Sequence, residues 1–374
     1  MKKSLWVLVL SIVLFGILLS IGFYLASHKP LWNDEAFSQI SIQRLSYTQI
    51  IQERVPEGNI CPLFYLIQKS INDAVGFQLP LPWDVNSIVD AKAQFILRIA
   101  PNICMSLSLT LLFYFFARFY SWSLGAYALL LSLSSFIVWA YWAEARPYAL
   151  WFLLTTLQLL IFTKLLNTKK NYSSWFTSFT IVNYLLSFTV IFSAIQMTVI
   201  SLLLWLFKDR NWRKYTYSSL IPLAICLYYY SHTRVDQFWF SGSIWKFITT
   251  NVSSDIFFLA TFYLAILLLT QKKLPKVSDA FLFCILLMIL CLNILLFIFT
   301  ITHGHAPTER YELSVRYYIF LAPLGIITAC HVLKELCEFY QQQRWALTLL
   351  YLLLTGLLIM RCLNVYPLIL GLYK

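Results

Sequence analysis

Charged side chains are scarce in this sequence. They make up 12% of its 374 residues, whereas hydrophobic residues make up 60% and the mean hydropathy is +0.72. No soluble core needs that much apolar surface, and the repeated apolar runs are long enough to cross a hydrocarbon layer roughly 30 Å thick. The composition therefore excludes an ordinary soluble protein. It predicts an all-α polytopic membrane protein.

Paired cysteines are also lacking. The eight cysteines are scattered without a CxxC pair, and most lie inside apolar runs, where cysteine behaves as a small hydrophobe. This pattern supports neither a disulfide framework nor a zinc site. Internal repeats, low-complexity tracts and the boundary of a separate soluble domain are missing too. We therefore treat residues 1–374 as a single transmembrane domain.

Acidic residues are fewer than basic ones, 16 against 28, which gives a net charge of +12. An excess of this size can indicate nucleic-acid binding. Here, however, the basic residues follow the alternating short loops between apolar runs, so we expect no nucleic-acid partner. The positive-inside rule then places the N-terminus in the cytoplasm. The basic residues of the predicted inner loops include Lys2, Lys3, Arg118, Lys164, Lys169, Lys170, Lys272, Lys273 and Lys334.

The apolar runs predict about eleven membrane spans. They lie at 5–26, 95–117, 123–141, 148–166, 174–189, 191–207, 216–230, 254–270, 278–301, 317–333 and 345–363. The first run is longer than the usual core of a signal peptide, and further spans follow it. We therefore expect a retained anchor in the cytoplasmic membrane rather than a cleaved leader.

The long loop 27–94 is predicted to be extracytoplasmic and to carry interfacial helices. Between Ala36 and Arg54, apolar and aromatic residues recur at spacings typical of an amphipathic helix in the membrane interface. Residues 56–59 are expected to break this helix. A second helix is expected from Cys61 to Gly76, because proline at position 62 suits a first helical turn.

Charged residues are almost absent at the predicted mid-membrane depth and gather at the predicted outer ends of spans. They include Asp34, Glu35, Arg98, Glu144, Arg146 and Arg316. An acidic pair at this boundary can act as a catalytic base, a metal ligand or a solvated loop charge. The planar fork of an arginine suits the two oxygens of a lipid phosphate. The other interpretation is that each arginine reaches the interface or pairs with a neighbouring acid.

Five short motifs occur in a characteristic order. They are Trp32-Asn33-Asp34-Glu35, Pro62-Leu63-Phe64-Tyr65, Arg98-Ile99-Ala100-Pro101, Glu144-Ala145-Arg146-Pro147-Tyr148, and Arg316-Tyr317-Tyr318 before Pro323. This order resembles the GT-C superfamily of integral-membrane glycosyltransferases. It is most similar to the family 39-like branch, which contains protein O-mannosyltransferases, the aminoarabinose transferase of lipid A, and bacterial sugar transferases of the RgtA/B/C/D-like type. The resemblance covers roughly residues 1–330.

The resemblance implies an enzyme that takes a sugar from a polyprenyl-phosphate donor on the extracytoplasmic face, with inversion. Asp34 would be the general base, and Glu35 would orient Asp34 or an arginine. The acceptor would be a hydroxyl of a glycolipid, a polysaccharide precursor or a protein. The residues expected to bind substrate are Arg98, Glu144, Arg146, Tyr148, Arg316 and Tyr317.

Some features depart from the family or leave the function open. The large luminal domain of the protein mannosyltransferases and the soluble C-terminal domain of the aminoarabinose transferase have no counterpart here. No cofactor is expected, although a divalent metal at Asp34 and Glu35 is the other interpretation.

A second hypothesis for the function is a polyprenyl-lipid flippase or transporter. Such a carrier should show repeated halves and charges along a path through the bilayer, and neither is visible. A third is an inactive relative that only binds the lipid.

Overall fold

The computed structural model describes residues 2–52, 61–78, 91–167, 172–206, 211–232, 319–339 and 344–372. Every regular element in these ranges is an α-helix, which confirms the predicted all-α class. The predicted spans 254–270 and 278–301 lie outside the described residues. So do the predicted break at 56–59 and the predicted substrate-binding residues Arg316 and Tyr317.

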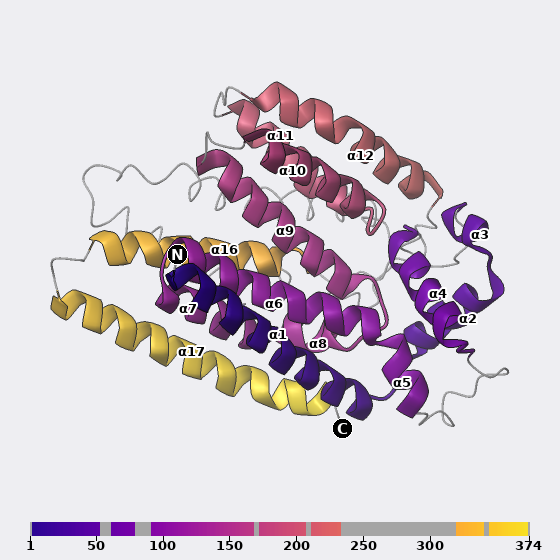
Figure 1. Ribbon diagram of the computed structural model, residues 1–374, viewed down its shortest axis with the longest axis horizontal. Coiled ribbons are helices and arrows are strands. Elements are labelled where there is room, and N and C mark those ends of the chain that lie inside the picture. Colours follow the sequence, from indigo (N-terminus) through magenta and orange to yellow (C-terminus); the bar gives the residue numbers. More distant parts are fainter. Residues whose placement is uncertain are drawn as a thin grey trace, which may run out of the picture.

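The helices form an elongated bundle around one central helix (Figure 1). That helix is α6 (Ile99–Phe119), which packs against α1 (Lys2–His28), α7 (Trp122–Leu133) and α9 (Tyr148–Asn167). The other helices of the bundle are α8 (Phe136–Trp142), α10 (Tyr172–Ser187), α11 (Ser193–Leu206), α12 (Trp212–His232), α16 (Leu321–Phe339) and α17 (Arg344–Leu372).

Several helices are apolar enough to indicate a membrane protein. Among the described residues, four are long and apolar enough to cross a bilayer, namely Leu5–His28, Ile99–Phe119, Tyr148–Leu166 and Leu347–Gly371. A fifth span results if α7 and α8, which meet at a bend of 68°, are counted as one. The predicted count of about eleven is therefore not confirmed. Each span predicted in the described ranges nevertheless coincides with a helix or with this bent pair.

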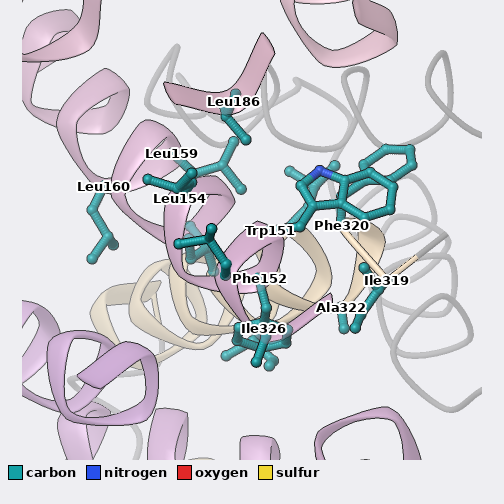
Figure 2. Packing of buried hydrophobic residues seen from close by; sticks show 14 of the residues in the cluster. Trp151, Phe152, Leu154, Leu159, Leu160, Leu186, Ile319, Phe320, Ala322 and Ile326 are labelled. Carbon is teal, nitrogen blue, oxygen red and sulfur yellow. The ribbon is translucent and has the colours of Figure 1, made fainter. Parts of the chain in front are cut away.

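The bundle is held together by large apolar side chains and by a few interhelical hydrogen bonds. Trp151 of α9 and Phe320, beside the start of α16, lie with their ring centroids 5.2 Å apart in a packed core (Figure 2). Gln158 of α9 donates a 2.8 Å hydrogen bond to the carboxamide oxygen of Asn183 in α10. Gln196 of α11 donates to Thr155 at 3.1 Å. Such polar contacts fix how apolar helices pair, because polar groups in hydrocarbon need partners.

Four short helices gather at one end of the bundle (Figure 1). They are α2 (Asn33–Arg44), α3 (Tyr47–Ile51), α4 (Leu63–Val75) and α5 (Ala91–Leu97). Helix α4 agrees with the helix predicted from Cys61 to Gly76. It ends at Gly76, whose φ of 63° is a left-handed conformation that favours glycine.

The single helix predicted from Ala36 to Arg54 was wrong, because the chain breaks it after Arg44. The side-chain oxygen of Ser46 accepts a hydrogen bond from the backbone of Gln49, whose side chain accepts one from the backbone of Ser46. This reciprocal capping starts a new helix. Of the four residues that predicted an interfacial position, Phe37, Tyr47 and Ile51 are 41% to 49% exposed, as contact with a membrane surface would require, whereas Ile40 is half-buried.

Candidate active site at one end of the bundle

Segments far apart in the sequence meet where α2 lies against the bundle. The end of α1, the first turn of α2, the start of α6 and the loop between α8 and α9 all contribute to this place. Asp34 and Glu35 occupy the first turn of α2, where negative charge is favourable beside the positive end of the helix dipole. Glu35 also accepts a 2.9 Å hydrogen bond from the backbone of Trp32, which helps to start the helix there.

Arg98 lies at the centre of this arrangement and is fully buried. Its Nε donates to Glu35 Oε1 at 3.0 Å and its Nη2 donates to Glu35 Oε2 at 2.7 Å. The remaining donors bond the backbone carbonyls of Ala26, Lys29 and Pro30 at the end of α1. These five bonds match the five N–H groups of a guanidinium. Arg98 therefore ties α1, α2 and α6 together.

This geometry corrects the expectation that Arg98 binds a lipid phosphate. Each of its N–H groups already has a protein acceptor, so a phosphate would have to displace one of them. Displacement would also break a buried bidentate ion pair, which is strongly unfavourable. The arrangement instead supports the other interpretation of an outer-end arginine, namely that it pairs with a neighbouring acid.

The hydrogen-bonding capacity of Glu35 is filled as completely as that of Arg98. Its Oε1 accepts from Arg98 and from the backbone of Ala145 at 2.7 Å, while its Oε2 accepts from Arg98 and from the backbone of Trp32. A carboxylate offers about four acceptor positions, and all are filled. Glu35 therefore holds the Ala145 loop onto α2. This leaves it no room to take a proton or to bind a metal ion.

The charge of Glu35 is stabilised by these contacts. Burial alone would raise its pKa, but the Arg98 guanidinium outweighs burial, with help from Lys29 and the backbone of Trp32. The net result is a pKa below the ordinary value of 4.5. Glu35 is therefore an ionised structural group rather than a proton acceptor.

Asp34 is the accessible acid of the pair, with a side chain that is 42% exposed. Its Oδ2 lies 3.9 Å from Nη2 of Arg146. Arg146 is mostly buried, and its Nη1 donates a 2.8 Å hydrogen bond to Ser38, one turn further along α2. The guanidinium also lies 5.8 Å from the ring of Tyr148. The structure thus brings the predicted residues Asp34, Arg146 and Tyr148 together.

Glu144, one of the residues expected to bind substrate, lies beside a cation of the protein itself. Its carboxylate lies 3.6 Å from Nζ of Lys29, which also donates to the backbone of Ala140 at 2.9 Å. Burial raises the pKa of Glu144, and the nearby charges of Glu35 and Asp34 add to this against the opposing effect of Lys29 and Arg146. Glu144 therefore takes up a proton more readily than an ordinary glutamate does.

Sequence reasoning did not identify Lys29 or Ser38 as part of this cluster. A signal for Lys29 exists, because it is a lone cation directly after a long apolar run and beside the acidic pair. Ser38 gives only the weaker signal of lying one helical turn after Asp34. Among the described residues, no group of three or more His, Cys, Asp or Glu side chains is arranged to hold a metal ion.

A third buried arginine lies away from this end. Arg361 is within the apolar stretch Leu347–Gly371 of α17, and its Nε donates a 3.0 Å hydrogen bond to Ser134 at the bend between α7 and α8. Arg361 sits where a helix break offers polar partners, which is how buried charges are tolerated inside a bilayer.

Comparison with known protein families finds no family that matches this chain, and comparison with curated proteins finds no similar sequence. Function is therefore inferred from the order of the motifs and from the geometry of the charged cluster.

Proposed function

We propose that this protein is a membrane glycosyltransferase that moves a sugar from a polyprenyl-phosphate donor to an acceptor hydroxyl. One observation supports this proposal above the others. The accessible carboxylate of Asp34 lies beside the buried guanidinium of Arg146. The ion pair between Glu35 and Arg98 fixes the helix turn that carries Asp34. A base and a phosphate-binding cation fixed side by side are what this reaction requires.

In the proposed reaction, the acceptor oxygen attacks the anomeric carbon while Asp34 takes its proton. The acceptor attacks from the side opposite the phosphate, the bond between the anomeric carbon and the phosphate oxygen breaks, and the phosphate leaves with the electron pair. Attack from that side inverts the anomeric configuration. General-base help of this kind contributes about 10²- to 10⁴-fold in rate. Arg146 would stabilise the negative charge that grows on the phosphate, because such charge is bound best by a fixed donor.

The other residues of the cluster have supporting parts in this proposal. Glu35 and Arg98 position the first turn of α2, and with it Asp34. Glu144 and Lys29 hold the loop that carries Arg146. Arg316 and Tyr317, outside the described residues, remain expected phosphate and substrate contacts by resemblance.

The proposed reaction also defines the two substrates and the side of the membrane on which they meet. The donor is a polyprenyl-phosphate sugar, and the acceptor is a glycolipid, a glycan or a protein hydroxyl. The displacement itself requires no cofactor. The active site would face the extracytoplasmic side of the cytoplasmic membrane, where such an enzyme would contribute to envelope glycan synthesis.

The test is sugar transfer by the purified protein in liposomes. Polyprenyl-phosphate sugars would be supplied with a panel of glycolipid acceptors, and free polyprenyl phosphate and glycosylated acceptor would be measured together. The proposal predicts that both products appear in equal amounts. Movement of the donor lipid across the bilayer without either product would contradict it and favour a carrier, for which Arg361 inside α17 is the one supporting observation.

A further inference from the structure

A groove lies between α7, α16 and α17, at the end of the bundle away from the charged cluster (Figure 1). Its volume is about 830 Å³. Sites for small molecules span roughly 300–1,000 Å³, so the groove is large enough for a ligand. The groove begins at the end of α6, whose other end carries Arg98. The 21 residues of α6 therefore separate it from the charged cluster by roughly 30 Å.

The lining of the groove changes from polar to apolar along the helices. Its mouth is formed by the first turn of α7 and the last two turns of α16, with Ser121, Ser123 and Lys334. Further along α7 and α17 the lining is mainly apolar and includes Leu130, Leu354 and Leu358. These residues belong to helices that are apolar enough to cross a bilayer. Water finds few polar partners on such a surface, so a hydrocarbon chain suits this part of the groove.

The α7 side of the mouth suits an anion. Ser121 caps α7, and its side-chain oxygen accepts a hydrogen bond from the backbone of Leu124. The hydroxyls of Ser121 and Ser123 lie 3.0 Å apart. Only one of their two protons is needed for the bond between them, so the other is a donor for a ligand. This donor lies at the positive end of the α7 dipole, which favours a phosphate.

The α16 side of the mouth suits a cation. Lys334 lies 3.0 Å from Glu335 and 3.2 Å from Glu338, so these three charges leave one negative charge in excess. They lie in the last two turns of α16, at the negative end of its dipole. Arg118 and Lys164 belong to the same end of the bundle, but neither lines the groove. A ligand with an anion beside a cation therefore matches the mouth better than an anion alone.

We infer that this groove binds a zwitterionic phospholipid with a primary ammonium headgroup, which is the chemistry of phosphatidylethanolamine. One acyl chain occupies the apolar part between α7 and α17. The phosphate accepts hydrogen bonds from the serine hydroxyls at the start of α7, and the ammonium lies toward the carboxylates of α16. The inference does not rest on the proposed function, because a lipid carrier would have the same groove.

The test is lipid binding to the delipidated full-length protein in detergent, measured by native mass spectrometry. The probes are phosphatidylethanolamine, phosphatidylcholine and phosphatidylglycerol with the same two acyl chains, so that only the headgroup differs. We expect phosphatidylethanolamine to bind about tenfold more tightly than either of the others, as one charge-assisted hydrogen bond predicts. Phosphatidylcholine lacks N–H donors, and phosphatidylglycerol lacks the cation.

Two tryptophan variants locate the bound lipid. Leu354→Trp fills the groove from α17, where Leu354 is half-buried, and Ala126→Trp fills it from α7, where Ala126 is exposed. Each should weaken binding of phosphatidylethanolamine about tenfold or more, because the added ring takes the place of the acyl chain. The matched control is Leu353→Trp, which is 58% exposed and outside the lining, and it should bind as the wild type does.

Size-exclusion chromatography and circular dichroism establish that each variant is folded, and the exposed Ala126 gives a second variant in case Leu354→Trp does not fold. Three results would overturn the inference. They are equal binding of the three lipids, tighter binding of phosphatidylglycerol, and binding of phosphatidylethanolamine that no folded groove variant weakens.

Discussion

At the scale of single residues, Glu35 and Arg98 form a closed unit in which the polar atoms are used up. Five donors meet five acceptors on one side, and four acceptor positions meet four donors on the other. Such a unit withstands burial only while both partners are present, because either charge alone would be left in a low-dielectric interior. Its rigidity is what fixes the position of Asp34.

Removing one partner of this buried ion pair should therefore lower the free energy of unfolding far more than breaking an ion pair at the surface. Glu35→Gln leaves Arg98 charged and buried, so we expect a loss of about 3–5 kcal/mol in the free energy of unfolding. Denaturant titration in mixed micelles measures this loss. Glu338→Gln, which breaks a pair with Lys334 whose acid is 59% exposed, is the control and should cost at most about 1 kcal/mol.

Similar losses in both variants would show that the buried pair has no special weight. If Glu35→Gln does not fold, the double variant Glu35→Gln with Arg98→Met gives the answer, because it removes the stranded charge. Replacing both charges of a buried pair is often close to neutral. We expect the double variant to be more stable than the single one.

The lowered pKa of Glu35 predicts how acid acts on the protein. A depressed carboxyl pKa stabilises the folded state fully above the ordinary value of 4.5, and this stabilisation is lost as the pH falls through the lower folded pKa. The difference in unfolding midpoint between wild type and Glu35→Gln should therefore shrink below pH 4.5. Glu144 titrates with the opposite sign because its pKa is raised, and the charge of Glu35 is one cause of that rise. Both proteins should therefore carry Glu144→Gln, so that the titration of Glu144 does not contribute to the difference. A constant difference at all pH values would contradict this prediction.

The sequence predicted which charged residues lie close together, but it did not predict which partner each of them binds. The acidic pair and the two arginines all lie in one cluster, as their positions at predicted span ends indicated. The use of Arg98 could not be predicted, because it depends on carbonyl groups at the end of α1. Backbone carbonyls carry no signature in the sequence, whereas an Asp-Glu pair does.

At the scale of elements, close contacts between helices set the frame that carries the cluster. Gly22 of α1 lies where a Cβ atom would be 2.6 Å from Nε1 of Trp142 and 2.9 Å from Oδ1 of Asn102. This contact brings α1 against α6 and the end of α8, directly beside the segment 143–147. Glycine is needed there because any side chain would push the helices apart.

This contact gives a paired prediction on one helix. Gly22→Ala should destabilise the protein by about 1–3 kcal/mol, since overpacking forces neighbouring groups to move. Gly16→Ala is the matched control, because a Cβ atom there meets nothing within 4 Å. It should be neutral or stabilising by up to about 1 kcal/mol through helix propensity. Unfolding in mixed micelles measures both, and a larger loss for Gly16→Ala would refute the packing argument.

The bounds of helices were predicted well where a long apolar run sets them. They were predicted less well where local capping hydrogen bonds set them. The predicted span 148–166 and the helix α9 (Tyr148–Asn167) agree closely, because a long apolar run has few other folds. The single helix predicted from Ala36 to Arg54 failed, because the Ser46 and Gln49 capping was not recognised. The bend between α7 and α8 was missed too, since Ser134 and Ser135 inside an apolar run give little warning.

At the scale of the whole molecule, the two ends of the bundle differ in chemistry. One end carries the cluster of paired charges around Asp34 and Glu35. The other end carries basic residues against aromatic rings, such as Lys164 over Phe119 and Lys334 near Tyr120. The positive-inside rule predicts that this basic end faces the cytoplasm.

Cysteine labelling tests this orientation. In a background without native cysteines, Ser70→Cys lies on α4 near the end that carries Asp34, and Ser123→Cys lies on α7 near the basic end; both positions are exposed. A membrane-impermeant maleimide added to intact cells should label the first and should label the second only after permeabilisation. The reverse pattern would place the candidate site in the cytoplasm, where the proposed donor orientation fails.

The proposed reaction depends on Asp34, which would remove a proton from the acceptor during sugar transfer. The most direct measurement compares transfer from polyprenyl-phosphate sugars by the wild type and by Asp34→Asn in liposomes, with donor binding measured in parallel. Glu338→Gln, an exposed acid on α16, is the control and should transfer as the wild type does. We predict that Asp34→Asn loses at least about a hundredfold in rate and still binds donor. Equal rates for wild type and Asp34→Asn would contradict the claim.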